Sequence, residues 1–204
     1  VAFSAGAVIG VALLDLAPES LDLAGPARGG IMFGLIALGF AGYLILSRTL
    51  EGLAAGPLRV GRFLGAASLT AHSALDGLAI GLGFQASPAA GLVLAAAVLA
   101  HDAADGINTV TLSLAASPNA RTARLWLAAD ALAPLVGVAL SRLIRPTPAS
   151  LGAALALFAG IFLHIGASEL LPASRAARPG FAASLATLAG LAVIALAVHL
   201  AQGL

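Results

Sequence analysis

The sequence contains no cysteine and no lysine, and charged residues make up only 9% of its 204 residues. The absence of cysteine excludes a disulfide framework and a metal site with thiolate ligands. Soluble domains carry roughly 25% charged residues, so this chain has too few charges to cover a water-facing surface. Its basic residues are all arginine and leave a net charge of +1, which excludes the clustered basic face that nucleic-acid binding needs.

The chain is instead rich in apolar residues, which make up 60% of it and form long runs separated by glycine, proline and arginine. A helix needs roughly 20 mainly apolar residues to cross a bilayer. Division of the chain at its Gly, Pro and Arg clusters therefore predicts an all-α polytopic membrane protein with a single transmembrane domain over residues 1–204. The seven expected helices cover about 1–17, 30–50, 61–86, 88–116, 122–143, 149–172 and 180–203.

The arginines set the expected orientation of these helices. If successive helices alternate in direction, one group of loops holds Arg48, Arg59, Arg62, Arg121, Arg124, Arg175 and Arg178, and the other holds Arg28, Arg142 and Arg145. Loops rich in arginine remain in the cytoplasm, so the first group is predicted to be cytoplasmic. The C-terminus then lies outside, and the protein is expected in the inner or plasma membrane of the cell.

Polar residues are concentrated inside the predicted helices rather than in the loops. The intramembrane acidic residues are Asp76, Asp102, Asp105, Asp130 and Glu169, and the intramembrane histidines are His72, His101, His164 and His199. A charged carboxylate at the bilayer centre is unfavourable by about 2.5–3.5 kcal/mol even on insertion scales. These side chains must therefore be paired, protonated or bound to a ligand.

Two neighbouring helices carry the same motif. One reads His72-Ser73-Ala74-Leu75-Asp76-Gly77, and the next reads His101-Asp102-Ala103-Ala104-Asp105-Gly106. In a helix, residues i and i+4 share a face, so each histidine lies one turn from an aspartate. Both motifs fall near the middle of their spans, and the short connector makes the two helices antiparallel neighbours. Two imidazoles and two carboxylates can then meet at one point, which is a ligand set suited to a divalent first-row metal such as zinc.

Two other uses of these motifs stay open. Buried histidine–aspartate pairs can hold helices together by hydrogen bonds, and they can also relay protons. The repetition of the pair at one depth favours metal binding over both alternatives. Asp102 adds a further carboxylate beside His101, which strengthens the case for a cation.

Other polar residues are candidates for a cation pathway. A buried carboxylate at Asp130 is expected to be functional, although the sequence does not identify its partner. His164 and Glu169 lie toward the end of the sixth predicted helix, where Glu169 could equally sit at the membrane interface. Asp15 and Glu19 end the first predicted helix, either as solvated side chains or as an acidic vestibule that attracts cations.

At these residues the sequence resembles the ZIP (Zrt- and Irt-like) family of metal transporters. The two motifs are similar to the family's fourth and fifth helices, which typically read His-Asn-x-x-Asp/Glu-Gly and His-Glu/Asn-x-Pro-Glu-Gly. Residues 5–19 look like the second helix of the family, and residues 160–172 look like the seventh. The resemblance therefore runs over the whole chain.

The resemblance implies an eight-helix fold in a 3+2+3 arrangement, of which this chain carries the second to eighth helices and lacks the first. It implies a carrier, and no enzyme, that moves divalent transition-metal ions toward the cytoplasm by elevator-type alternating access. The cargo is expected to be Zn²⁺, with Cd²⁺, Fe²⁺, Mn²⁺ and Co²⁺ as alternatives, and no separate cofactor is expected. The expected partners are the metal ion and the lipid bilayer, with no nucleic acid, and a homodimer is left open.

The chain departs from the family at the second metal position. Family members with two adjacent metals use an Asn, an acidic residue and a Glu, where this chain has Ser73, Asp102 and Ala133. By resemblance, the principal site consists of His72, Asp76, His101 and Asp105, and the weakened second site consists of Asp102 and Ser73. We therefore expect one well-occupied ion per chain. Because the ligands must be deprotonated to bind metal, uptake is expected to weaken at acidic pH.

Two rival functions would use the same residues. A membrane metal-dependent hydrolase needs an open position on its metal and a general base, for which Asp102 is the candidate. A proton-conducting carrier would use the His/Asp residues without any metal. No nucleophile motif supports the hydrolase, and a proton carrier would be insensitive to chelation of the metal.

Overall fold

A computed structural model describes residues 1–54, 61–177 and 180–202; within these ranges some side chains, that of His101 among them, lie outside the described set. The described backbone is helical almost throughout and contains no strand. The chain forms two compact units. Unit 1 comprises Val1–Tyr43, Leu82–His101 and Arg145–Leu204, and unit 2 comprises Leu44–Gly81 and Asp102–Ile144.

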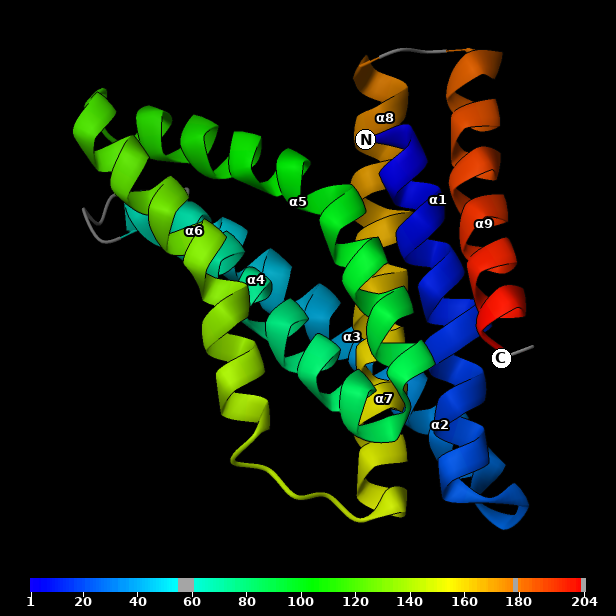
Figure 1. Ribbon diagram of the computed structural model, residues 1–204. Coiled ribbons are helices and arrows are strands. Elements are labelled where there is room, and N and C mark those ends of the chain that lie inside the picture. Colours follow the sequence, from blue (N-terminus) through cyan, green and yellow to red (C-terminus); the bar gives the residue numbers. More distant parts are fainter. Residues whose placement is uncertain (55–60, 178–179, 203–204) are drawn as a thin grey trace. The chain divides into compact units, whose positions relative to one another are not determined.

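The helices follow one another with short connections (Figure 1). In chain order the described elements are α1 (Ala2–Val11), η1 (Ala12–Leu16), α2 (Ala17–Ala24), η2 (Pro26–Arg28), α3 (Gly29–Ala54), α4 (Gly61–Ala86), α5 (Pro88–Ala116), α6 (Ala120–Ser141), α7 (Pro148–His164), η3 (Ile165–Leu170), α8 (Leu171–Ala177) and α9 (Phe181–Gln202). Of these, η1 and η3 are π-helical and η2 is a 3₁₀ turn. Arg59 and Arg178, on which the predicted orientation partly depends, lie outside the described residues.

Helices of membrane-spanning character dominate the described part of the chain. Five are long and apolar enough to cross a bilayer, namely Ala2–Ala24, Gly29–Leu50, Ala120–Ser141, Pro148–Ala176 and Phe181–Leu200. The chain is therefore an all-α polytopic membrane protein, as predicted. Within the described residues, α5 contains a shorter apolar stretch over Pro88–Leu99. That α4 and α5 also span the membrane stays a prediction, and their lengths of 26 and 29 residues, roughly 40 Å each, are sufficient for it.

Two helix starts follow directly from the local sequence. The Ser87 hydroxyl accepts a hydrogen bond from the Ala90 N–H at 3.1 Å, so Ser87 is the N-cap of α5. Pro88 then occupies the first helical position, where no backbone N–H is needed. The Asn119 side chain caps α6 in the same manner by accepting from the Arg121 N–H at 2.9 Å.

In unit 1, α1 packs along α9, and α2 packs along α7 (Figure 1). Glycines permit the close approach of these helices. A Cβ on Gly6 would overlap the carbonyl oxygen of Thr187, and a Cβ on Gly190 would overlap the carbonyl oxygen of Phe3. Such small-residue contacts are typical of packed membrane helices, where close approach of the backbones replaces the hydrophobic driving force of water.

Two helices of unit 1 contain a π-helical segment just before a proline. η1 ends two residues before Pro18, and η3 ends two residues before Pro172. A proline ring clashes with the carbonyl four residues earlier and normally ends or kinks a helix. The wider π turn relieves that clash. The helix that begins with α1 therefore continues to Ala24, and the helix that begins with α7 continues to Ala177. Each predicted helix end at these prolines was therefore too early.

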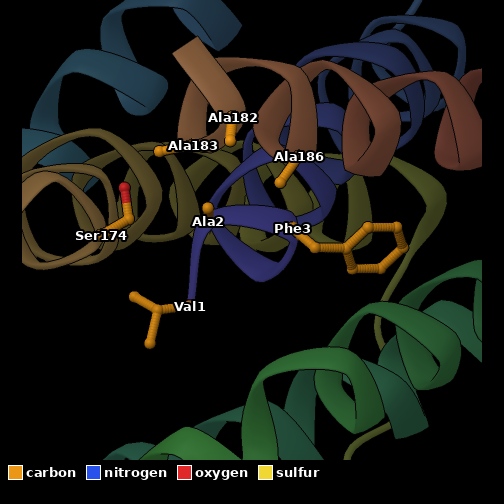
Figure 2. A pocket seen from close by; sticks show the side chains of 7 residues that line it. All are labelled: Val1, Ala2, Phe3, Ser174, Ala182, Ala183 and Ala186. Atoms are coloured by element: carbon orange, nitrogen blue, oxygen red, sulfur yellow. The ribbon is translucent and has the colours of Figure 1, made fainter. Parts of the chain in front are cut away.

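An open hollow of about 430 Å³ lies beside the first residues of α1. Figure 2 shows its lining, which consists of Val1, Ala2, Phe3, Ser174, Ala182, Ala183 and Ala186. The hydroxyl of Ser174 in this lining donates to the carbonyl of Leu171 at 2.7 Å. The described residues of this lining include no carboxylate or imidazole, the ligands that a transition metal would need here.

In unit 2, α4 and α6 lie in close contact along a seam of small residues. The facing pairs are Ser73 with Asp130, Gly77 with Pro134, and Gly81 with Ser141. Because the residue numbers rise together along both helices, α4 and α6 run parallel. A Cβ on Gly77 would overlap the carbonyl oxygen of Pro134, so this seam needs glycine to close.

Candidate metal centre

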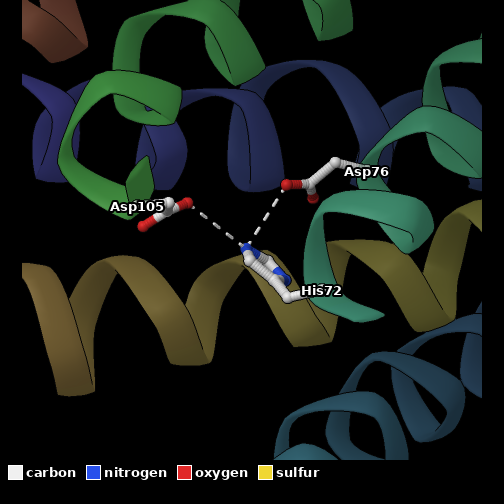
Figure 3. A group of neighbouring side chains, drawn as sticks. All are labelled: His72, Asp76 and Asp105. Carbon is white, nitrogen blue, oxygen red and sulfur yellow. Dashed lines mark ion pairs between the residues drawn. The ribbon is translucent and has the colours of Figure 1, made fainter. Parts of the chain in front are cut away.

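Helices α4 and α5 bring three ligand-type side chains together within unit 2. His72 and Asp76 lie one turn apart on α4, and Asp105 lies on α5. His72 Nε2 is 3.3 Å from Asp76 Oδ2 and 3.9 Å from Asp105 Oδ2. Figure 3 shows the imidazole nitrogen directed between the two carboxylates. One ligand atom from each residue lies within 4.8 Å of the other two, so the three form a single cluster.

The cluster is buried. His72 is 4% exposed, Asp76 is 2% exposed and Asp105 is 6% exposed. Two ionised carboxylates leave the group negatively charged even when the imidazole is protonated. Buried charge is unfavourable unless it is neutralised, and attraction between opposite charges is much stronger away from water. A divalent cation among these side chains would therefore offset the excess negative charge.

The separations in the cluster match those between ligands of one tetrahedral ion. Zinc–nitrogen and zinc–oxygen bonds of about 2.1 Å place two ligands of a tetrahedron roughly 3.4 Å apart. The two N–O separations, 3.3 and 3.9 Å, lie on either side of that value. A direct charge-assisted hydrogen bond would be shorter, about 2.7–2.9 Å. Side chains at these separations could hold a metal ion.

Four of the predicted site residues outside this three-residue cluster are His101, Asp102, Asp15 and Glu19. The side chain of His101, the fourth predicted ligand of the principal site, lies outside the described residues. Asp102 is half-buried on α5 and is not a member of the cluster. Asp15 and Glu19 are half-buried one turn apart along η1 and α2. The roles predicted for these residues stay predictions.

The structure identifies the partner of Asp130, which the sequence did not. The Ser73 hydroxyl donates to Asp130 Oδ1 at 2.9 Å, and it also lies 3.2 Å from the carbonyl oxygen of Leu69. Both polar side chains are buried. Ser73, predicted as a ligand of the weakened second site, is thus engaged in the α4–α6 seam. Ala133, the position where two-metal relatives carry Glu, is also buried on α6.

His164 and Glu169 lie together in unit 1. His164 Nε2 is 3.6 Å from Glu169 Oε1. The imidazole is buried, with the Phe40 ring edge-on at 5.1 Å between centroids and the Tyr43 ring tilted at 5.5 Å. Glu169 is exposed. The structure therefore brings these two candidates to each other, and a role in a cation pathway stays a prediction for both.

Two buried hydroxyls on α5 were missed by the sequence reasoning. Thr109 and Ser113 are both 0% exposed. They follow Asp105 at positions i+4 and i+8, so all three residues share one face of the helix. That spacing of polar residues after a motif aspartate was the available signal.

Comparison with known proteins identifies the family. A sequence profile described as ZIP Zinc transporter matches residues 51–197, which is well over half of the chain and includes the whole His72–Asp76–Asp105 cluster. No match was found among curated proteins. The match agrees with the resemblance carried by the two His/Asp motifs. The chain belongs to the ZIP zinc transporter family.

Proposed function

We propose that this ZIP family member carries divalent transition-metal ions, zinc in particular, toward the cytoplasm through an intramembrane site formed by His72, Asp76, His101 and Asp105. Family membership establishes metal-ion transport in general, because the family consists of transporters rather than enzymes. The ligands, the direction and the mechanism are the parts that we propose.

The observation that carries the proposal is the His72 nitrogen facing carboxylates from two different helices. Asp76 comes from α4 and Asp105 from α5, at separations of 3.3 and 3.9 Å from His72 Nε2. His101 precedes Asp105 by one helical turn, so it is the natural fourth ligand on the same face of α5. The resulting set of two imidazoles and two carboxylates suits Zn²⁺, and it also accepts Cd²⁺, Fe²⁺, Mn²⁺ and Co²⁺.

The direction of transport is the one that the family resemblance implies, and the arginine distribution supplies the orientation of the helices. Arg121 and Arg124 belong to the loop group with more arginines, which the positive-inside rule assigns to the cytoplasm. The C-terminus then lies outside the inner or plasma membrane. Metal enters from the outer side, exchanges water for imidazole and carboxylate, and is released on the cytoplasmic side.

Elevator-type alternating access requires the metal-carrying helices to move as one body. The α4–α6 seam supports this mechanism, because Gly77 and Gly137 leave no space between the two backbones. The hydrogen bond from Ser73 to Asp130 adds a polar link at the same seam. α4, which supplies two cluster residues, is thereby joined firmly to α6.

The proposal is tested by removing one carboxylate at a time. Asp76→Ala and Asp105→Ala are each expected to reduce saturable Zn²⁺ flux in proteoliposomes to the level of protein-free vesicles, because the single remaining carboxylate no longer compensates a dehydrated divalent ion. Zn²⁺ uptake is measured with a fluorescent indicator trapped inside the vesicles. Asp22→Ala is the matched control, because Asp22 is an exposed carboxylate of α2 and its loss should leave flux intact.

Undiminished flux in both cluster variants, with normal folding by thermal unfolding in detergent, would refute the site. The same vesicles separate the rival functions. A proton-conducting carrier would acidify the lumen after the metal has been chelated, whereas the proposed carrier would not. A hydrolase would show turnover without Zn²⁺ accumulating inside.

A further inference from the structure

We propose that Thr109 and Ser113 continue the metal pathway from Asp105 along one face of α5, as a stripe of oxygen atoms that a partly hydrated divalent cation follows after it leaves the ligand cluster. This inference rests on the proposed function and extends it from the binding site to the release route. We call these three residues the α5 oxygen stripe.

The stripe follows from helical periodicity. Asp105, Thr109 and Ser113 are spaced four residues apart in an uninterrupted helix, so each side chain lies almost directly above the one before. At 1.5 Å per residue the stripe extends about 12 Å along the axis. It begins at Asp105, a member of the metal cluster, and leads toward the end of α5 at Ala116.

The burial and bonding of the two hydroxyls are unusual for a membrane helix. Both residues are 0% exposed, and neither hydroxyl has a hydrogen-bond partner among the described residues. Hydroxyls inside helices commonly donate to the carbonyl four residues earlier. Thr111 does so on the same helix, with its hydroxyl 2.8 Å from the Ile107 carbonyl oxygen. Thr109 and Ser113 therefore hold their hydroxyls away from the usual backbone acceptor.

A buried polar group without a partner destabilises the folded protein, so its presence in the interior calls for a reason. Water or a passing hydrated ion supplies the missing hydrogen bonds. A Thr or Ser oxygen can accept a hydrogen bond from bound water or contact the cation directly, because hydroxyls both donate and accept.

Hydroxyls suit release better than a second set of strong ligands would. Conduction requires sites that bind well enough to admit the ion and weakly enough to let it leave. Neutral hydroxyl oxygens meet this condition beside a cluster of imidazole and carboxylate. In the proposed orientation the C-terminal end of α5 is cytoplasmic, so the stripe lies on the release side of the cluster.

The experiment compares hydroxyl removal on the two faces of α5. Thr109→Val and Ser113→Ala remove a hydroxyl with little change in volume, and Thr111→Val is the matched control because Thr111 is exposed and already bonded. We expect each stripe variant to lower the maximal Zn²⁺ flux in proteoliposomes roughly three- to tenfold, and the Thr111→Val protein to keep its full rate. Thr109→Ser, which keeps the oxygen, should retain most of the flux.

Two further readouts separate a pathway role from a structural one. The equilibrium Kd for Zn²⁺ in detergent should be unchanged in the stripe variants, because the cluster is intact. Their thermal unfolding midpoint should be equal or higher, because an unpartnered buried hydroxyl has been removed. Unchanged maximal flux in the Thr109→Val/Ser113→Ala double variant, or a loss of flux that only tracks a loss of stability, would overturn the proposal.

Failure of the pathway is distinguishable from failure of the proposed function. If the pathway alone is wrong, Asp76→Ala still abolishes flux while the stripe variants transport normally. If Asp76→Ala binds and transports Zn²⁺ like the unaltered protein, the proposed metal site is refuted. The proposed pathway, which starts from that site, is then refuted as well.

Discussion

At the scale of single residues, the candidate metal centre depends on one imidazole that faces carboxylates of two helices. His72 Nε2 faces Asp76 on its own helix and Asp105 on the next. The other polar residue of the same α4 turn, Ser73, is turned to Asp130 instead. Neighbouring residues of one motif thus serve different purposes, His72 in the cluster and Ser73 in the helix seam.

This division of roles predicts the metal stoichiometry. Two divalent ions about 4 Å apart repel by on the order of 15 kcal/mol at an effective dielectric near 20, so a second ion needs a shared carboxylate at position 133, where this chain has Ala133. We expect equilibrium dialysis to give one tightly bound Zn²⁺ per chain. Ala133→Glu should add a second, and Ala133→Gln, of similar size without the charge, should not.

Two tight ions per unaltered chain would contradict this prediction. It would then follow that Asp102, which lies half-buried on α5, compensates for the missing carboxylate. The variant Ala133→Glu should transport at least as well as the unaltered chain, since the second ion is not required for transport.

At the scale of helices, the position of His72 and Asp76 depends on how closely α4 approaches α6. Gly77 lies next to Asp76 and directly against the Pro134 backbone. A Cβ on Gly137 would likewise overlap the carbonyl oxygen of Ala74. The seam therefore fixes the position of α4 at Gly77, the residue next to the cluster member Asp76.

Gly77→Ala tests this contact. The new methyl group meets a backbone carbonyl that cannot turn aside, so we expect a loss of about 1–3 kcal/mol in unfolding free energy and weaker Zn²⁺ binding. Gly42→Ala is the control, because a Cβ there meets nothing within 4 Å, and alanine in a helix is favoured over glycine by roughly 0.5–1 kcal/mol. Thermal unfolding in detergent should therefore show opposite signs for the two variants, and equal effects would refute the close seam.

At the scale of the whole molecule, the arginine distribution predicts which ends of the helices face the cytoplasm. Arg121 and Arg124 lie at the start of α6, directly after the loop that precedes this helix. Arg145 lies in the loop after α6. The positive-inside rule places the first loop in the cytoplasm and the second outside.

The absence of cysteine makes this orientation directly testable, since any introduced cysteine is the only thiol. Ala120→Cys and Ile144→Cys place a thiol at exposed positions near the two ends of α6. A membrane-impermeant maleimide added to intact cells should label the protein with Cys at 144 and spare the one with Cys at 120, until the membrane is permeabilised. The reverse labelling pattern would invert the proposed orientation and the direction of transport.

The sequence by itself determined the fold class and the family. Low charge and long apolar runs require a membrane environment whatever the arrangement of the helices, and the profile match confirms the family that the two motifs indicated. The pairing of His72 with Asp76 was also predictable, because a spacing of four residues is a local property of any helix.

Only the tertiary structure decided which residues meet between helices. That His72 faces Asp105 of α5, that Asp130 pairs with Ser73, and that Thr109 is fully buried all depend on the rotation of each helix about its axis and on the distance to its neighbour. Spacing along the chain fixes neither quantity, because contacts between helices are set by the packing of small residues such as Gly77 against a backbone far away in sequence.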